Sequence, residues 1–474
     1  MRQRVAVIGG GIAGLAAAVR VRDQAPPDTD IIVYERSRVL GGKLRTGELI
    51  GATVERGAES FLVGAPDGTY SAAVRLARRL GLGDALVHPS AARAALASGG
   101  RLEPIPAGTL MGIPCEYDGD DRDTGTPLLG PHDDVTVGAL VRARFDDDVV
   151  ERLVDPLLGG VYAGRADQLS LAATMPALAA AARTEHTLAA AVRVAQTGTV
   201  RVPGRPMFAT VDGGLSRLVE AAAAASGARI NLGLPVHRLV RTAHGWRLLF
   251  APASAAHVED VDAVVLAVPA KAASRLLHSA GDTSGAATLG ALNYASVALV
   301  AMALPAGTPL PELSGFLVPA TEGTLVKAAT FVTRKWPRPG QADGPVIIRA
   351  SLGIAYDQQR LQRDDTVLAA QAHAELGALL GDELPTPITT WVQRWEDALP
   401  QYPTGHLERV ASARAGLLSG LALAGAAYDG VGIPACIASG EAAADKVCDY
   451  LGCQPRRFSS VDVEAAARAA RAAR

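Results

Sequence analysis

Apolar residues near the start of the chain fall into two short runs that predict neighbouring strands of one sheet. Residues 4–8 form the first run and lead directly into a glycine-rich turn, and residues 31–34 form the second run and end at Glu35. The stretch between the runs is long enough for one helix, so the order predicts a strand–helix–strand unit. In such a unit the two strands are parallel and the helix crosses over between them.

Further along the chain, apolar positions recur at helical spacing in some stretches and form short strand-like runs in others. Thr136 is placed to cap one of the helices. A turn at residues 98–100 predicts a hairpin over residues 96–106. The expected helices cover residues 70–86, 136–158, 171–197, 218–225 and 435–450. The expected strands cover residues 229–232, 246–250, 263–268, 295–303, 313–318, 328–332, 346–350 and 421–425.

These elements predict the α/β class, with a Rossmann-like nucleotide-binding domain that is interrupted by an insertion and later resumed. A chain of 474 residues is long enough for two or three domains with substantial cores. The expected parts are the nucleotide-binding domain over residues 1–63, 205–272 and 390–455, a substrate domain with a mixed, largely antiparallel sheet over residues 64–110 and 273–389, a helical insertion over residues 111–204, and a flexible tail over residues 456–474.

The first glycine-rich turn has the spacing of a dinucleotide-binding fingerprint. Gly9 permits the tight turn after the strand, Gly11 lets the backbone approach a pyrophosphate, and Gly14 lets helix and strand pack closely. The helix then presents free N–H groups to the phosphates. Glu35 follows Gly14 by 21 residues, which suits a carboxylate that holds the ribose hydroxyls and disfavours NADP. The fingerprint comprises Gly9, Gly10, Gly11, Ile12, Ala13 and Gly14.

Two further glycine turns favour FAD over NAD as the ligand. Gly41 and Gly42 come just after the second strand and allow the backbone to pass close to a long ligand. Lys43 follows them, where its ammonium group can meet a phosphate or a flavin oxygen. Residues 55–61 supply another glycine turn with polar groups.

A glycine-containing turn near the C-terminus, residues 430–435, admits two interpretations. It has the form of a second fingerprint for NADH, but no strand with a ribose-binding acid follows it. The favoured interpretation directs the N-terminus of the following helix at the flavin ring, where it stabilises the negative charge of reduced flavin by about 1 kcal/mol. Without a separate nicotinamide-binding fold, an oxidase that passes electrons to oxygen is favoured over a reductase.

Composition and charge exclude several classes. The formal net charge of −2 gives no indication of nucleic-acid binding. No apolar run has the length of a transmembrane helix, and a first strand at residue 4 leaves no room for a signal peptide. The four cysteines have no metal or disulfide spacing, so reduced thiols, a cytoplasmic location and no metal are expected. The acidic run at residues 116–123 is expected to be a solvated loop.

Four motifs extend the pattern over nearly the whole chain, at residues 56–62, 155–164, 395–406 and 430–437. Together with the fingerprint they resemble the protoporphyrinogen/coproporphyrinogen III oxidase family of amine-oxidase-like flavoproteins. The last two motifs are specific to that family, whereas the fingerprint belongs to the wider superfamily.

The resemblance implies noncovalent FAD and the six-electron oxidation of a porphyrinogen to a porphyrin by three molecules of oxygen, with release of hydrogen peroxide. Soluble bacterial members commonly act on coproporphyrinogen III in a route to heme, which suggests a later enzyme of that route as a partner. Protoporphyrinogen IX, an amine or polyene substrate, and a noncatalytic scaffold stay open as alternatives. Residues 114–134 are shorter than is usual in the family, so peripheral membrane contact also stays open.

The resemblance also implies which residues contact FAD. Val236 matches a valine whose backbone meets the adenine, and Trp395 matches a residue beside the flavin ring. Cys436 is expected to be a small buried residue rather than a site of covalent attachment. The complete expected set is Gly9 to Gly14, Glu35, Arg36, Gly42, Lys43, Gly57, Ala58, Glu59, Ser60, Val236, Trp395, Val431, Gly432 and Ile433.

The resemblance defines the substrate side less well. Arg93 aligns with a family arginine that binds a substrate carboxylate, and a solvated surface role is its alternative. No catalytic base stands out, because flavin N5 accepts hydride and the protein chiefly positions the substrate carbon. Tyr402 and His406 are expected to pack near Trp395 rather than carry protons.

Overall fold

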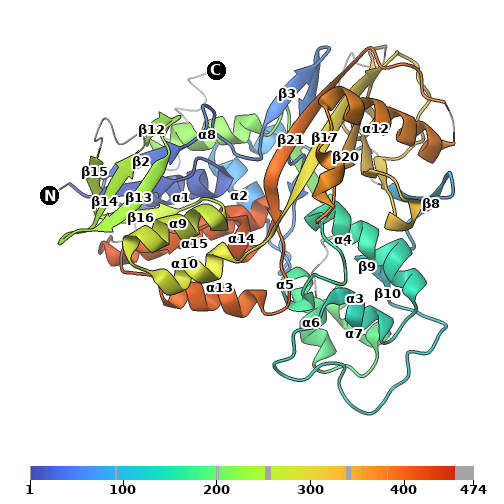
Figure 1. Ribbon diagram of the computed structural model, residues 1–474, viewed down its shortest axis with the longest axis horizontal. Helices are drawn as coiled ribbons and strands as arrows, with labels where there is room; N and C mark the ends of the chain where they lie inside the picture. The colour runs from blue at the N-terminus through green and yellow to red at the C-terminus, as the bar shows by residue number, and fades with distance from the viewer. Residues whose placement is uncertain are drawn as a thin grey trace.

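The structure is a computed structural model that describes residues 2–90, 93–198, 200, 202–250, 258–337, 343–355, 357–381 and 383–453. The flexible tail expected at residues 456–474 lies outside these residues. Figure 1 shows a parallel sheet with its helices on the left, a tall second sheet at the upper right, and a group of helices below that second sheet. This arrangement confirms the expected α/β class.

The parallel sheet begins with the predicted strand–helix–strand unit. Its alternating side chains enter two separate cores: Val5 and Val7 pack under α1, whereas Ala6 and Ile8 face the opposite layer. Burial on both faces explains why these strands appear as unbroken apolar runs in the sequence. The five strands are parallel, in the spatial order β12 (Arg229–Leu232), β2 (Asp30–Glu35), β1 (Arg4–Ile8), β16 (Ala263–Leu266) and β22 (Leu421–Leu423).

Helices cover both faces of this sheet. On one face lie α1 (Ile12–Gln24), α8 (Ser216–Ser226), α15 (Ile433–Tyr450) and the short α2 (Ala72–Arg79). The opposite face is covered by α9 (Ala270–Ala280), α10 (Thr283–Gly290), α13 (His406–Ala415) and a three-stranded sheet of β13 (Val236–Arg241), β14 (Trp246–Phe250) and β15 (Val258–Val261).

The second sheet has seven strands and is antiparallel except where β18 pairs with β7, as the prediction of a largely antiparallel sheet requires. The predicted hairpin is present as β7 and β8. On one face, α12 (Asp365–Leu380) closes a core. The strand order is β21 (Thr389–Pro400), β17 (Tyr294–Leu304), β20 (Val346–Leu352), β19 (Val326–Phe331), β18 (Gly315–Leu317), β7 (Ala94–Ser98) and β8 (Arg101–Pro104).

Several segments lie elsewhere than the predicted domain limits assign them. β21 was expected in the nucleotide-binding domain from residue 390, but it pairs with β17 in the seven-stranded sheet. Its half-exposed, mixed polar and apolar sequence gives no buried-strand signal. Conversely, α9 was expected largely, and α2 and α10 wholly, in the substrate domain, yet all three pack on the parallel sheet side. The other domain limits stay a prediction.

The helical insertion has its own core, and its helices are shorter than predicted. Thr136 caps α3 (Val137–Arg142) by accepting the N–H of Ala139, as expected. A turn of π-helix (Val149–Val154) then leads into α4 (Asp155–Tyr162). The predicted helix over residues 171–197 is divided into α5 (Leu171–Thr174), α6 (Pro176–Ala182) and α7 (Leu188–Thr197).

The acidic run at residues 116–123 has no regular secondary structure, as expected, but it is not purely solvated. The Asp121 carboxylate accepts the N–H groups of Leu188 and Ala189 at the start of α7, at 3.0 and 2.9 Å. This contact satisfies helix N–H groups that lack an intrahelical partner. One acid of the run therefore has a structural role.

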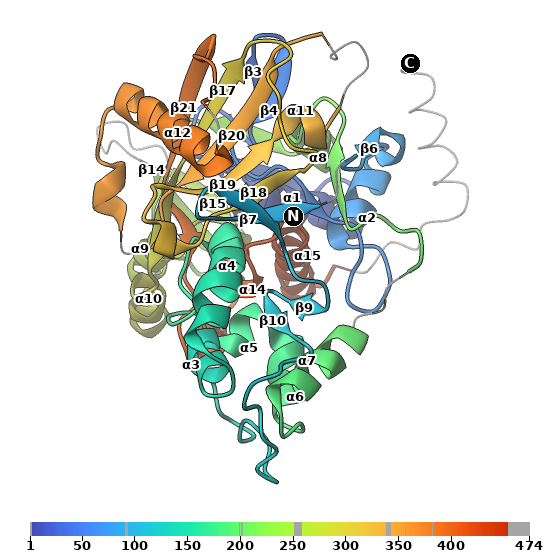
Figure 2. The same cartoon turned by 90° about the vertical axis from the view of Figure 1, so that its right-hand side faces the viewer.

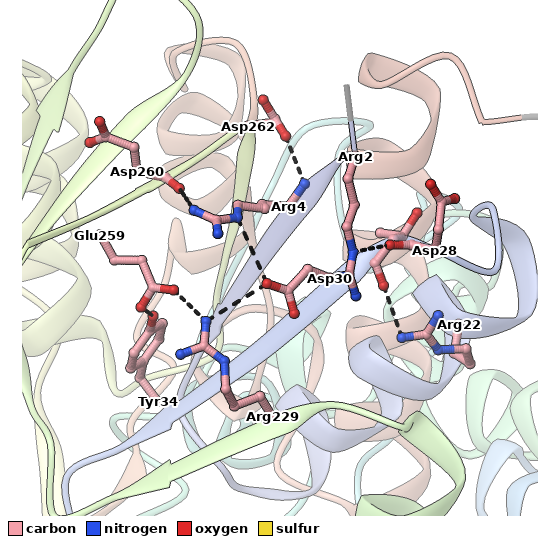
Figure 3. A network of polar contacts seen from close by, with 11 residues as sticks. Arg2, Arg4, Arg22, Asp28, Asp30, Tyr34, Arg229, Glu259, Asp260 and Asp262 are labelled. Carbon is pink, nitrogen blue, oxygen red and sulfur yellow. Dashed lines mark hydrogen bonds and ion pairs between the residues drawn. The ribbon is translucent and has the colours of Figure 1, made fainter.

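An ion-pair network joins the strands at the outer edge of the parallel sheet (Figure 3). Asp30 lies 3.8 Å from Arg4 and 3.7 Å from Arg229. Arg229 also pairs with Glu259, which accepts the hydroxyl of Tyr34. Asp30 and Arg4 begin their strands, whereas the glycine turn follows the other strand ends, so this network stabilises the sheet away from the turn.

Among the described residues, no helix is long and apolar enough to cross a membrane, and no group of three or more His, Cys, Asp and Glu side chains has a metal-binding arrangement.

Candidate functional site: a cradle for a dinucleotide

The three glycines of the fingerprint occupy positions where a side chain has different consequences. Gly9 has φ +111°, and a Cβ there would lie 2.2 Å from the Ala267 carbonyl oxygen. A Cβ on Gly14 would lie 2.0 Å from the Gly9 carbonyl oxygen. A Cβ on Gly11 would meet nothing within 4 Å. The turn is therefore closed against helix and strand but open at Gly11.

The open space at Gly11 faces the N-terminus of α1. Gly11 is the N-cap and provides no side-chain acceptor, and the first turn contains no acidic residue. The N–H groups of the first helical residues, which include Ile12 and Ala13, are therefore free to bind an anion. This arrangement fits a pyrophosphate.

Glu35 stands at the end of β2, beside the glycine turn. Its carboxylate accepts the N–H of Gly10 at 2.8 Å and that of Ser37 at 2.7 Å. The segment that leads to Val236 is held against the same place, because Leu234 donates to the Glu35 carbonyl at 3.1 Å. Glu35 and the segment of Val236 are thus brought together from distant parts of the chain. The Arg36 side chain is exposed.

The other two glycine turns pack against the first. Gly41 donates its N–H to the Gly10 carbonyl at 2.8 Å, which sets Gly42 next to Gly11. Ala58 donates to the Lys43 carbonyl at 3.0 Å, and a Cβ on Gly57 would lie 2.0 Å from that same oxygen. Residues 9–14, 41–43 and 57–58 therefore form one continuous cradle of backbone.

Two elements from the C-terminal half reach this cradle. Trp395 of β21 donates its Nε1–H to the Arg56 carbonyl at 2.5 Å, and its ring edge lies next to Gly57. The N-terminus of α15 contributes Ile433, which shares a buried cluster with Ile12 and Leu44. Gly432 is the N-cap of α15 and has no side-chain cap, so that helix also presents free N–H groups beside Val431.

Comparison with known proteins identifies the family of the chain. A family model described as flavin containing amine oxidoreductase matches residues 12–448. The chain belongs to this family. Coproporphyrinogen III oxidase of Mycobacterium tuberculosis (strain CDC 1551 / Oshkosh) is 36% identical over 472 residues, which cover 95% of this chain and 98% of the relative. Coproporphyrinogen III oxidase of Bacillus subtilis (strain 168) is 30% identical, and the match covers 95% of this chain and 99% of that relative.

Solved structures agree with this assignment. A putative protoporphyrinogen oxidase from Exiguobacterium sp. 255-15 superposes with a TM-score of 0.80 at 29% identity, over 95% of this chain and 99% of that one. Cyclohexylamine oxidase from Brevibacterium oxydans IH-35A has a TM-score of 0.70 at 17% identity, over 95% and 100%, and shows the shared fold. As a flavin containing amine oxidoreductase, the protein uses FAD, and the open, anion-binding cradle fits that cofactor.

Lys43 and Cys436 lie close together near the cradle of this flavoprotein. Burial lowers the pKa of the Lys43 ammonium group. Burial also raises the pKa of the Cys436 thiol to about 11, and its Sγ lies 3.6 Å from the Gly430 carbonyl oxygen. A thiol with so high a pKa is a poor nucleophile, which favours a packing role over a covalent link. The expected burial is only partial, because Cys436 is half-buried.

Glu59 has a structural role that the sequence did not reveal. Its carboxylate pairs with Lys335 at 2.7 Å and with Arg349 at 2.5 Å, and Trp336 Nε1 donates to it at 2.8 Å. It also lines a cavity of about 460 Å³ beside the β3–β4 hairpin (Thr46–Leu49 and Ala52–Glu55). The Glu59 side chain is therefore occupied by protein partners, and its assignment to the cofactor, like that of the half-buried Ser60, stays a prediction.

Arg93 differs in exposure from two cationic residues of the seven-stranded sheet. Arg93 is exposed and precedes β7, where its carbonyl accepts the N–H of Ser314 at 2.8 Å. Lys327 and Arg349, by contrast, are partly buried on β19 and β20, and sequence reasoning missed both. Their positions depend on strand pairing between distant segments, for which the sequence carries no local signal.

Tyr402 and His406 are packed inside the protein. Their rings stack with centroids 4.4 Å apart, and both residues are buried. Burial lowers the pKa of the His406 imidazole to about 4, so it is neutral near pH 7. The interpretation as packing residues is favoured over that as proton carriers.

Proposed function

We propose that this flavoprotein oxidises coproporphyrinogen III to coproporphyrin III in a heme-forming route, with three molecules of oxygen consumed and three of hydrogen peroxide released. The observation that carries the proposal is similarity over nearly the full length to bacterial proteins named coproporphyrinogen III oxidase, at 36% identity in the mycobacterial case. The Staphylococcus aureus protein of that name is 27% identical and is covered completely.

The residues of the cradle have separate tasks in this proposal. Gly9 to Gly14 and the N-terminus of α1 bind the pyrophosphate, and Glu35 holds the ribose hydroxyls. Val236 contacts the adenine through its backbone. Arg36 lies beside the adenine, with its side chain exposed. Gly42, Lys43 and residues 57–60 follow the cofactor toward Trp395. Val431, Gly432 and Ile433 meet its ring at the start of α15.

When bound, FAD supplies an acceptor for two electrons at each of the three oxidation steps and passes them to dioxygen. The protein contributes position and electrostatics. The free N–H groups at the start of α15 favour negative charge near the cofactor ring, and the apolar surroundings exclude water. Trp395 closes one side of the cradle, and in this proposal the substrate meets the cofactor ring next to it.

Protoporphyrinogen IX is a second candidate substrate. A Bos taurus protein named protoporphyrinogen oxidase is 29% identical over 96% of this chain and 100% of its own. Coproporphyrinogen III carries two propionates where protoporphyrinogen IX carries two vinyl groups. The number of cationic side chains around the bound substrate therefore favours one substrate over the other. The amine oxidase compared above matches over the full length but at only 17% identity, so it supports the shared fold and not an amine substrate. None of the proteins compared above is named as a noncatalytic scaffold.

The decisive experiment compares rates on coproporphyrinogen III, protoporphyrinogen IX and a panel of amines, with porphyrin fluorescence and peroxide as readouts. The proposal expects the highest kcat/KM on coproporphyrinogen III, with peroxide formed in proportion to porphyrin. Faster oxidation of protoporphyrinogen IX or of an amine would contradict coproporphyrinogen III as the substrate. A bound flavin that reacts with none of these substrates would favour the noncatalytic scaffold. We place the reaction in the cytoplasm, with peripheral membrane contact open and with a later heme-pathway enzyme receiving the product.

A further inference from the structure

Lys327 stands at an irregularity of the seven-stranded sheet. The register of β19 against β20 shifts between Val326 and Ala328, so Lys327 falls in a β-bulge. Val326 and Ala329 point into the core under α12. Lys327 instead reaches the opposite side, where its Nζ donates to the Gly159 carbonyl of α4 at 3.2 Å. A bulge re-aims a side chain, and here it turns a lysine away from the apolar core.

The side that Lys327 faces is the side that carries Trp395. Figure 2 shows α4 directly beneath β18 and β19, on the face that α12 leaves free. Ala163, just after α4, shares a buried cluster with Val297 of β17, and Trp395 packs against that cluster. Lys327 and Trp395 therefore border the same interior region.

The pairing of the strands sets their separation. Trp395 pairs with Val297, the neighbouring Ala298 pairs with Leu352, and Leu352 pairs with Val326. Lys327 thus lies on nearly the same row of the sheet as Trp395, three strand spacings away, which is about 14 Å. A tetrapyrrole that meets the flavin ring near Trp395 has its propionates at its rim, toward Lys327.

Within the described part of the chain, no ion pair neutralises the charge of Lys327. Among the described residues, no carboxylate forms an ion pair with it, and the Gly159 carbonyl is the partner found. Arg349 on the neighbouring strand, by contrast, pairs with Glu59 at 2.5 Å. An enclosed cation without an anion is costly, so the site favours a ligand that brings one.

Charged groups on the elements around Lys327 are occupied elsewhere. Burial raises the pKa of Tyr162 on α4 to about 12, so this phenol is neutral near pH 7. The acids and their partners are Asp155 with Arg165 at 2.9 Å, Glu322 with the N–H of Gly99 at 3.1 Å, and Glu375 with the N–H groups of Leu325 and Val326 at 2.9 and 2.8 Å.

We infer that Lys327 binds a propionate carboxylate of the porphyrinogen and thereby positions the ring against the cofactor. This inference rests on the proposed function and adds a specificity-determining residue to it. Burial lowers the pKa of Lys327 to about 7. Because a bound carboxylate needs the protonated lysine, the affinity for the substrate falls as the pH rises above that value.

The test uses FAD-loaded full-length protein and two substitutions, Lys327→Met and Lys327→Arg. KM and kcat for coproporphyrinogen III are measured one pH unit below and one above 7, where the unmodified protein is expected to show a rise in KM of roughly tenfold. Lys327→Met raises KM at the lower pH by a similar factor and removes its pH dependence, with kcat retained. Lys327→Arg keeps KM low at both pH values, because arginine stays charged.

Lys446→Met, which changes an exposed lysine of α15, serves as the matched control and keeps both constants. A Lys327→Met protein with unchanged KM and pH profile overturns the inference while leaving the proposed function intact. If Lys327→Met does not retain FAD, Lys327→Arg decides, since a KM that still rises with pH in this variant overturns the inference. A lack of porphyrin formation by the unmodified protein overturns the proposed function and the inference with it.

Discussion

The two sides of the site are built by different means. The cofactor side consists of backbone, and its essential residues act through the lack of a side chain, as at Gly11 and Gly14. The substrate side consists of long cationic side chains on strands, as with Lys327 and Arg349. The comparison teaches that a cradle of backbone holds its shape without its ligand, whereas buried cations need an anion from the protein or from the substrate.

The largest expected effect is where the two sides meet, because Glu59, next to the cradle, neutralises Lys335 and Arg349. Glu59→Ala leaves two enclosed cations without their counter-ion, so the free energy of unfolding is expected to fall by about 3–5 kcal/mol. Urea unfolding near neutral pH measures the change. Glu408→Ala, at an exposed acid of α13, is the control and stays within about 0.5 kcal/mol. Equal stability of both variants would contradict the assigned role.

The same carboxylate predicts a pH dependence. Burial by itself raises the pKa of Glu59, but the charges of Lys335 and Arg349 outweigh it and lower the pKa to about 2 from 4.5. The ion pair therefore stabilises the fold fully above pH 4.5 and loses this contribution as the pH falls toward 2. The contribution is about 3 kcal/mol. Unfolding curves of Glu59→Gln should lack this acid-dependent part, and an unchanged slope would exclude it.

On the cofactor side, Gly14→Ala and Gly11→Ala separate fold from binding. Alanine at Gly14 collides with the Gly9 carbonyl, and overpacking of this kind costs about 1–3 kcal/mol of stability. Alanine at Gly11 meets open space, so the cofactor-free protein is expected to keep its stability. The added methyl group would occupy the space expected for the pyrophosphate, so the dissociation constant of FAD is expected to rise about 10-fold or more. Titration with FAD and thermal unfolding of the cofactor-free proteins measure both. Unchanged FAD binding by Gly11→Ala would refute the cradle.

The smallest expected effect at neutral pH comes from His406, which is buried against Tyr402 at the start of α13. His406→Phe keeps a ring against Tyr402, so kcat should change by less than about twofold if this histidine carries no proton. The pKa of His406 is lowered from 6.5 to about 4, so the unmodified protein loses stability as the pH falls from 6.5 toward 4. The variant should lack that loss. A large drop in kcat would restore the proton-carrier interpretation.

The same comparison explains what the sequence could predict. The strand–helix–strand unit, the hairpin and the glycine turns depend on neighbouring residues, so their patterns were sufficient. The sequence did not predict β21, because most of its residues are only partly buried or exposed and form no apolar run. It did not predict the position of Lys327, because the side chain is re-aimed by a bulge between Val326 and Ala328. Arg93 was proposed because it aligns with a family arginine, yet its side chain is exposed in this structure, since alignment alone does not establish burial.

The most direct test of the account is anaerobic mixing of the FAD-loaded protein with coproporphyrinogen III while the visible flavin absorbance is followed. The account predicts that the flavin is bleached, and that admitting oxygen restores it with the appearance of porphyrin fluorescence and peroxide. Flavin that stays oxidised in the presence of the porphyrinogen, or protein that retains no FAD, would contradict it.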